Sequence, residues 1–286
     1  MADYVLVKDI PLFLKRGVGI RISPKLEREL GALERGFASR LVKLINACGV
    51  SVRVLSSAEF IKGIKNLTSG SALPIISIDA VLGCGLGEVF QINNSITLSK
   101  EPYRRKPEPR FGCKPLEAQA LELAKKYKGK SVALFDDDLW TGRSVLYCIR
   151  LFKKHKINVR RIYSCTATQK AIGSLSAKGI AVFPLFKRPV LSLDETRNFL
   201  CDGRAISKTH LHPPLNSYAG RLFSPVWDSL RNEPYFKVNQ PDIRALSEEY
   251  ISKLNELLKK HRKRTKVKKL GVQNSYTVYC IERSHP

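Results

Sequence analysis

Apolar and polar positions repeat along the chain with two different periods, and the period changes from segment to segment. Over Pro24–Cys48 apolar residues recur every three or four positions, which predicts a helix with Ser23 as its N-cap. Val50–Leu55 alternates with period two and predicts a short strand, and Phe60–Leu67 predicts a second helix. We therefore expect helices and a strand in the first 70 residues.

From residue 71 onwards, short apolar runs alternate with amphipathic segments. Strands are predicted at Pro74–Ile78, Ile92–Leu98, Val132–Phe135, Val159–Cys165 and Ile180–Phe183. Helices are predicted at 116–127, around 145–152 and between the last two strands, whereas Glu101–Arg110, with its three prolines, is expected to be irregular. Gly83–Gly87 reads as a tight turn. This order predicts the α/β class, with a parallel sheet that carries helices on both faces.

After about Pro189 the apolar pattern weakens. Residues 197–241 are rich in Pro, Asn, Ser and aromatic residues, and a helical face returns over residues 243–257. That helix leads into Lys259–Lys269, where eight of eleven residues are Lys or Arg and none is acidic. We expect three units: an N-terminal extension at 1–70 that is a candidate hood, a core at 71–190, and a C-terminal extension at 191–286 with a basic helix.

Charge and cysteine content narrow the class of protein. Fifty Lys and Arg against 25 Asp and Glu leave a net charge of +25, which favours nucleic acid, phosphorylated small molecules or an acidic partner. The seven cysteines are scattered without a C-x-x-C pair, which is typical of reduced thiols and argues against a disulfide framework or a zinc site. No apolar run reaches the ~20 residues of a membrane span, and no signal peptide is apparent. We expect a cytoplasmic protein without a membrane partner.

The most informative stretch, Ser131–Ser144, reads S-V-A-L-F-D-D-D-L-W-T-G-R-S. In an open α/β sheet, ligands bind beyond the carboxyl ends of the strands, and Asp136 and Asp137 should lie there, directly after Phe135. The turn at 138–142 can present backbone N–H groups to an anion, and a helix beginning near Arg143 adds the positive end of its dipole. Carboxylates repel phosphate, so they should face sugar hydroxyls or a metal. A phosphorylated sugar satisfies both halves of the stretch.

Val132–Ser144 resembles the 5-phosphoribosyl-1-pyrophosphate (PRPP) motif of the type I phosphoribosyltransferases, in which four apolar residues and two acids precede three variable residues and T-G-x-[ST]. In that family the two acids hydrogen-bond the ribose hydroxyls and the following loop holds the 5′-phosphate. The resemblance covers roughly Leu73–Phe186 and implies a phosphoribosyltransferase-like core. It implies PRPP-binding roles for Asp136, Asp137, Asp138, Leu139, Trp140, Thr141, Gly142, Arg143 and Ser144.

Two further loops of the family have weaker counterparts in this chain. The resemblance places a pyrophosphate-binding loop at Asp79 and Ala80, after an early strand. It places a mobile, often basic loop at 100–110, where Lys100, Arg104 and Arg105 are candidate pyrophosphate ligands.

The reaction that the resemblance implies is transfer of phosphoribose to a nitrogenous base with release of pyrophosphate, a pentosyltransferase reaction of nucleotide metabolism. Mg²⁺ would neutralise the leaving group, although no residue is assigned to the metal. No catalytic residue is assigned either, because Trp140 stands where some purine enzymes of the family carry an acid. The acceptor base is not identified by the sequence, and a homodimer is compatible with it.

Other interpretations remain open. Asp136 and Asp138 form the D-x-D of glycosyltransferases that bind nucleotide sugars, but that interpretation leaves Thr141–Ser144 unexplained. A catalytically inactive or regulatory protein of the same fold would use Lys259–Lys269 on nucleic acid, in a prokaryotic defence or gene-regulation context. The basic run is equally compatible with a solvated helix end, and no aromatic residue is interleaved with it.

Overall fold

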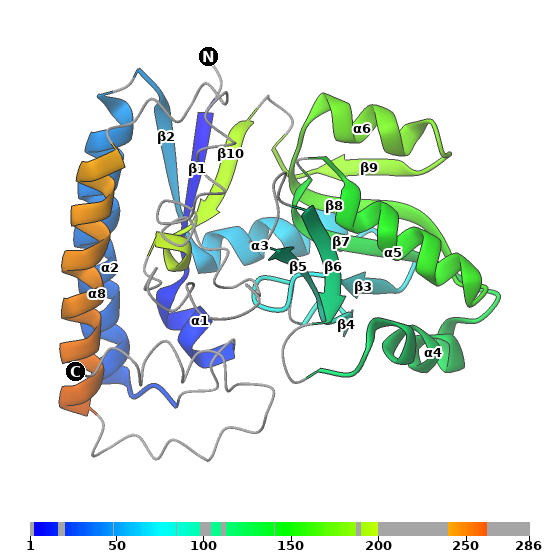
Figure 1. Cartoon of the computed structure of the whole chain (residues 1–286), viewed down its shortest axis with the longest axis horizontal. Helices are drawn as coiled ribbons and strands as arrows, with labels where there is room; N and C mark the ends of the chain where they lie inside the picture. Colours follow the sequence, from blue (N-terminus) through cyan, green and yellow to red (C-terminus); the bar gives the residue numbers. More distant parts are fainter. Residues whose placement is uncertain are drawn as a thin grey trace.

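The computed structural model describes residues 3–16, 21–47, 49–83, 85–97, 104–109, 113–139, 141–186, 190–199 and 240–261. Two parallel sheets organise this part of the chain, as Figure 1 shows. The larger has the strand order β4-β3-β7-β8-β9 and the smaller the order β10-β1-β2. Every strand pair in these two sheets is parallel. The protein is therefore an α/β protein, and the predicted parallel sheet with flanking helices is confirmed.

The larger sheet is built from residues in the middle of the chain. Its strands are β3 (Ile75–Ser77), β4 (Glu88–Val89), β7 (Ser131–Leu139), β8 (Asn158–Ala167) and β9 (Ala181–Pro184). Three helices follow the same stretch of chain: α4 (Leu116–Tyr127), α5 (Arg143–Lys154) and α6 (Gln169–Ser176). Because β7 pairs with β3 on one side and β8 on the other, it is the central strand.

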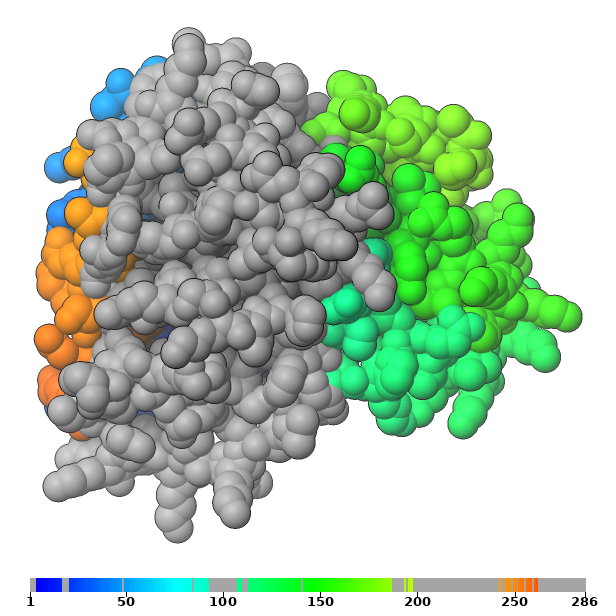
Figure 2. Space-filling view, viewed as in Figure 1, coloured from blue at the N-terminus to red at the C-terminus, as the bar shows by residue number. Residues whose placement is uncertain are grey.

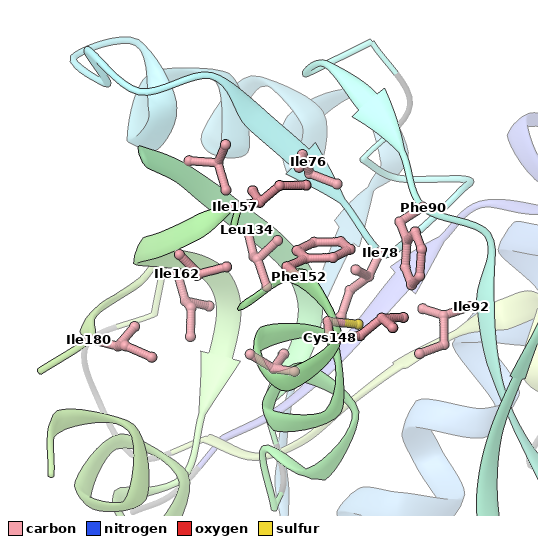
Figure 3. Packing of buried hydrophobic residues seen from close by; sticks show 14 of the residues in the cluster. Ile76, Ile78, Phe90, Ile92, Leu134, Cys148, Phe152, Ile157, Ile162 and Ile180 are labelled. Atoms are coloured by element: carbon pink, nitrogen blue, oxygen red, sulfur yellow. The ribbon is translucent and has the colours of Figure 1, made fainter. Parts of the chain in front are cut away.

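Both faces of the larger sheet are buried, which explains why its central strands are almost continuously apolar. On one face Leu134 and Ile162 pack in the cluster formed with α4, α5 and α6, where Phe152 is fully buried (Figure 3). On the other face Phe135 packs with Phe60 of α3 (Ser57–Thr68) and with strands of the smaller sheet. The alternation of the side chains of β7 therefore separates two cores.

The smaller sheet joins segments that are far apart in the sequence. Its strands are β1 (Asp3–Lys8), β2 (Ser51–Ser56) and β10 (Val190–Glu195), with β1 in the middle. The helices α1 (Ile10–Arg16), α2 (Pro24–Asn46) and α8 (Gln240–His261) and the 3₁₀ helix η1 (Thr196–Phe199) accompany it. The N-terminal and C-terminal parts of the chain thus contribute to one sheet and its covering helices (Figure 1).

The long helices α2 and α8 pack side by side and antiparallel (Figure 1). Arg40, in the second half of α2, forms an ion pair of 2.6 Å with Glu249, near the middle of α8. The opposite ends are joined by His261 and Glu29 at 3.2 Å. The basic run that begins at Lys259 therefore starts at the end of α8 nearest the beginning of α2, and residues 262–269 lie outside the part that the structure describes.

Several helix limits follow the sequence signals. As predicted, α2 begins at Pro24, and the Ser23 hydroxyl accepts the N–H of Leu26 at 3.2 Å. The helix α3 begins with a reciprocal capping box between Ser56 and Glu59. Within the described residues no helix has the length and apolar character that crossing a membrane requires.

The proline-rich segment 101–110 was expected to be irregular, and that expectation is wrong for β6 (Arg104–Pro109). This strand pairs antiparallel with β5 (Ile92–Thr97), and Pro107 lies opposite Asn94. The pair forms a separate two-stranded ribbon, so each strand has one unpaired edge. A proline, which has no N–H to donate, is tolerated on such an edge.

Candidate functional site

The three acids of the motif lie inside a strand. This corrects the prediction that Asp136 and Asp137 lie beyond a strand ending at Phe135 and that Asp138 begins the following turn. The strand β7 continues to Leu139 because β8 is long enough to extend the ladder beside it. Asp136 pairs in register with Ser164, and Asp138 with Thr166. The carboxyl end of β7 is thus a rigid strand end that carries three half-buried carboxylates.

Strand alternation places Asp136 and Asp138 in phase with Leu134, and Asp137 in phase with Phe135. At the end of the strand, the side chains of Asp136 and Asp137 nevertheless share a hydrogen bond. Asp138 accepts a hydrogen bond of 2.5 Å from the Thr166 hydroxyl. Burial, reinforced by the neighbouring charge of Asp137, raises the pKa of Asp136 well above its usual value.

The turn after β7 forms the start of α5. Gly142 has φ = +66°, a left-handed conformation that favours glycine, and its carbonyl accepts the N–H of Leu146 at 2.8 Å. No side chain caps the N-terminus of α5, and the Arg143 N–H lies 3.5 Å from the Thr141 hydroxyl. Backbone N–H groups at such a helix end attract an anion. The helix begins at Arg143 as predicted; Ser144 is its second residue, and Trp140 lies outside the described residues.

The predicted pyrophosphate loop follows β3, the neighbour of β7, so it lies at the same edge of the sheet. One Asp79 oxygen accepts the N–H groups of Val81 at 3.1 Å, of Leu82, and of Gly83 at 3.0 Å. The carboxylate of Asp79 therefore holds its own loop in shape. The guanidinium of Arg16 donates to the carbonyl of Val81 at 3.1 Å and ties α1 to this loop.

The remaining candidate pyrophosphate ligands are only partly located. Ala80 belongs to the loop that Asp79 organises, and its side chain is half-buried. Arg104 and Arg105 lie in β6, opposite Thr97 and Ile96. Lys100 lies outside the described residues.

A buried arginine that the sequence did not single out joins the two sheets at this edge. Arg197, in η1, forms ion pairs with Asp9, with Glu195 at 3.2 Å and with Asp79 at 3.7 Å. Its side chain is only 10% exposed. Asp9 follows β1 and Glu195 ends β10, so the carboxyl ends of both small-sheet strands meet the Asp79 loop through one cation. The D-E-T-R stretch after the β10 apolar residues was the available sequence signal.

The charged groups around Arg197 lie close enough to change one another's pKa. Burial lowers the pKa of the Arg197 guanidinium, but the carboxylates of Asp9 and Glu195 outweigh it and keep the group charged. Burial raises the pKa of Glu195 despite the opposing effect of Arg197, and the charge of Asp137 raises it further. The acids of β7 and the Arg197 cluster therefore belong to one electrostatic neighbourhood.

A second buried carboxyl group supports the cluster from α2. Glu34 accepts the N–H of Ile10 at 2.8 Å and a hydrogen bond from the Thr196 hydroxyl. Burial raises the pKa of Glu34 to about 7. The helices α1 and α2 and η1 are thus joined by polar contacts directly behind the Asp9–Arg197 ion pair.

The described side chains do not form a metal cage by themselves. Within the part of the chain that the structure describes, no group of three or more His, Cys, Asp or Glu is placed to hold a metal ion. Mg²⁺ needs no such group when phosphates of a ligand supply the other oxygens, because it then uses one or two carboxylates and water. The acids at the end of β7 fit that mode of binding.

Comparison with known proteins identifies only distant structural similarity. No protein-family model and no curated protein match the chain. An orotate phosphoribosyltransferase of Mycobacterium tuberculosis H37Rv matches 45% of this chain and 69% of its own, with 12% identity and a TM-score of 0.29. An adenine phosphoribosyltransferase of Saccharomyces cerevisiae matches 46% and 79%, with 12% identity and a TM-score of 0.28. A hypothetical protein of Neisseria gonorrhoeae with bound ppGpp matches 49% and 81%, with 16% identity and a TM-score of 0.32. Such low scores assign neither a family nor a function.

Proposed function

We propose that the chain binds PRPP at the carboxyl end of β7 and transfers its phosphoribosyl group to a nitrogenous base, with release of pyrophosphate. The observation that carries this proposal is the position of the carboxylates Asp136 and Asp137 beside the left-handed Gly142 and the uncapped N-terminus of α5. Carboxylates suit the hydroxyls of a ribose, and a helix N-terminus suits a phosphate. One ligand that carries both groups is a phosphorylated ribose.

In this proposal, different residues bind the phosphate and the ribose of the ligand. The N–H groups of the 141–144 turn and the dipole of α5 hold the 5′-phosphate, and Gly142 lets the backbone approach it closely. Asp136 and Asp137 accept hydrogen bonds from the ribose hydroxyls. Asp138 is already engaged by Thr166, and we assign it to holding the end of β7 in place.

In this proposal, pyrophosphate and Mg²⁺ bind beside the loop that follows β3. The carboxylate of Asp79 repels a phosphate, so the loop contributes through backbone groups near Ala80, with Lys100, Arg104 and Arg105 as sources of positive charge from the β5–β6 segment. Mg²⁺, held by the pyrophosphate oxygens and a carboxylate of β7, would neutralise the leaving group. Positioning and electrostatic stabilisation then supply most of the catalysis.

Calorimetric titration with PRPP and Mg²⁺ tests the binding site. Asp137→Asn removes a charge-assisted hydrogen bond worth about 1.5–3 kcal/mol, so the affinity should fall roughly 10- to 100-fold. Gly142→Ala strains the turn and should also weaken binding. Glu122→Gln is the matched control, because it removes an exposed carboxylate of α4 and should leave the affinity unchanged. Wild-type affinity in both site variants would refute the assignment of the site.

Pyrophosphate release from PRPP and Mg²⁺ with a panel of purine and pyrimidine bases tests the reaction. We expect release with at least one base and its loss in Asp137→Asn. A wild-type protein that binds PRPP but releases pyrophosphate with none of the bases would refute the transferase activity while leaving the binding site intact.

A second candidate function keeps the PRPP site without the transfer reaction: a regulatory protein that binds nucleic acid through Lys259–Lys269. The observation that favours it is the net charge of +25 together with this run of basic residues. Lys260 and His261 contact Glu29 at 3.3 and 3.2 Å, so the beginning of the run is held against α2. Absence of pyrophosphate release with every base, together with salt-sensitive binding of RNA or DNA, would select this function.

A further inference from the structure

A second basic surface lies at the edge of the larger sheet opposite the candidate site. The turns that follow α4 and α5 are joined there by hydrogen bonds, from the Gly129 N–H to the Lys156 carbonyl at 2.7 Å and from the Asn158 N–H to the Lys130 carbonyl at 3.0 Å. Figure 1 shows the ends of α4 and α5 together at the right of the view. This edge holds the amino ends of β7 and β8, whereas the carboxylates of β7 lie at the other end.

Six lysines gather on these two helix ends and turns, and all six are exposed. We call this surface the lysine edge: Lys125, Lys128, Lys130, Lys153, Lys154 and Lys156. In the space-filling view, the α4 and α5 residues form the right-hand border of the molecule (Figure 2). The lysines come from two separate runs of the sequence, at 125–130 and 153–156, and only the folded structure brings these runs together.

Nearby acids are committed to other partners. Glu122 forms an ion pair with Lys114, and Glu117 contacts His155 at 2.9 Å. Glu88 forms an ion pair of 2.7 Å with Lys126, which we leave out of the lysine edge for that reason. Among the residues that the structure describes, none forms an ion pair with a lysine of the edge.

Helix stabilisation accounts for only half of these lysines. Lys125, Lys153 and Lys154 lie in the last turns of their helices, where positive charge complements the helix dipole. Lys128, Lys130 and Lys156 lie beyond the helix ends. Lys156 has φ = +60°, a left-handed conformation that costs a residue with a side chain roughly 1–2 kcal/mol. A lysine therefore occupies a position where glycine would relieve strain, and helix stability does not explain it.

We propose that the lysine edge binds the phosphate backbone of nucleic acid, without reading its bases and independently of the PRPP site. Ammonium groups are compact point charges suited to successive phosphates, and clustering them favours a polyanion over a single anion. The lysine edge lacks an exposed aromatic ring for base stacking, since Tyr127 is buried. Of the large exposed apolar side chains among the described residues (Val54, Leu121 and Phe183), only Leu121 lies on α4 or α5, so the surface offers one such side chain for insertion into lipid rather than an apolar face.

The salt dependence of binding tests this proposal, with the full-length protein and fluorescently labelled duplex DNA and single-stranded RNA. Each phosphate neutralised contributes about −0.9 to the slope of log K against log salt for a duplex. The triple variant Lys128→Ala, Lys130→Ala, Lys156→Ala should therefore reduce the magnitude of that slope by about 3 and weaken binding at least tenfold at about 100 mM salt. These side chains are exposed, so the variant should keep the wild-type unfolding midpoint.

Two control variants carry the same change in net charge. Lys43→Ala, Lys62→Ala, Lys65→Ala removes three exposed lysines of α2 and α3 and should leave the slope near its wild-type value. Lys266→Ala, Lys268→Ala, Lys269→Ala tests the basic run separately. A lysine-edge variant with wild-type slope and affinity would overturn the proposal. The proposal would also be overturned if the wild-type protein bound anionic vesicles or polyglutamate but bound neither DNA nor RNA.

The two proposals fail in different experiments. The lysine-edge variant should bind PRPP as the wild-type protein does, and Asp137→Asn should bind nucleic acid as the wild-type protein does. Loss of nucleic-acid binding in Asp137→Asn together with its retention in the lysine-edge variant would overturn the independent basic surface and leave the PRPP site in place.

Discussion

The buried carboxyl group of Glu34 should make the stability of the protein fall as the pH rises toward neutrality. Its side chain is 4% exposed, and it accepts hydrogen bonds from the Ile10 N–H and the Thr196 hydroxyl. Burial disfavours the charged form and raises the pKa of Glu34 from 4.5 to about 7. In the unfolded chain the group is in water and keeps its ordinary pKa.

The sign and the size of the effect follow from proton linkage. Between pH 4.5 and about 7 the folded protein holds a proton on Glu34 that the unfolded chain has lost. The free energy of unfolding therefore falls by about 1.4 kcal/mol for each pH unit in this interval, in total by about 3 kcal/mol. The contribution is fully present below pH 4.5 and is lost as the pH rises through 7.

Glu34→Gln isolates this contribution, because glutamine does not ionise and retains a carbonyl oxygen for the Ile10 N–H. Urea unfolding followed by circular dichroism between about pH 5 and 8 measures the free-energy difference between variant and wild type. Relative to wild type, the variant should gain about 3 kcal/mol across that range. Glu27→Gln, an exposed change on the same helix, should keep the wild-type pH dependence. A difference between Glu34→Gln and wild type that stays constant with pH, or that changes in the opposite direction, would refute the reasoning.

Three further predictions concern single side chains. Arg197→Met leaves the buried carboxylate of Asp9 without its cation and should lower the free energy of unfolding by about 3–5 kcal/mol in urea; an unchanged midpoint would contradict this. Ser23→Ala removes the cap of α2 and should cost about 1 kcal/mol, which Ser23→Asp should restore. Burial raises the pKa of the Cys148 thiol, so iodoacetamide should modify Cys148 only after the protein unfolds. Mass spectrometry of the labelled protein measures this. Labelling of Cys148 in the folded protein as fast as that of the half-buried Cys113 would contradict the prediction.

Elements with strong local signals were predictable. The apolar face of α2 was read from its spacing, and Leu26, Leu30, Phe37, Leu41 and Ile45 are all buried. The strands β3, β8 and β9 and the start of α5 also lie where the sequence indicated. These signals work because burial in a helix or a strand imposes a period of 3.6 or 2 on neighbouring residues.

Elements that depend on distant partners were harder to predict. The strand β1 is a short apolar run whose status depends on pairing with β2 and with β10, about 190 residues away. The strand β6 exists because β5 pairs with it in spite of its prolines. The extension of β7 through its acids was decided by the length of β8. Each case turns on a partner strand that local periodicity does not report.

The sequence by itself determined the chemistry at the carboxyl end of β7: paired acids, then a glycine that opens a helix, on a strand of a parallel sheet. Only the tertiary structure decided what surrounds it. Arg197 gains its role from carboxylates that follow β1 and β3 and end β10, and that meet in a place removed from water. The lysine edge exists because two turns, separated by a strand and a helix, are hydrogen-bonded to each other. Spacing along a chain reports which residues are buried, whereas ion pairs and charged surfaces depend on which segments fold against one another.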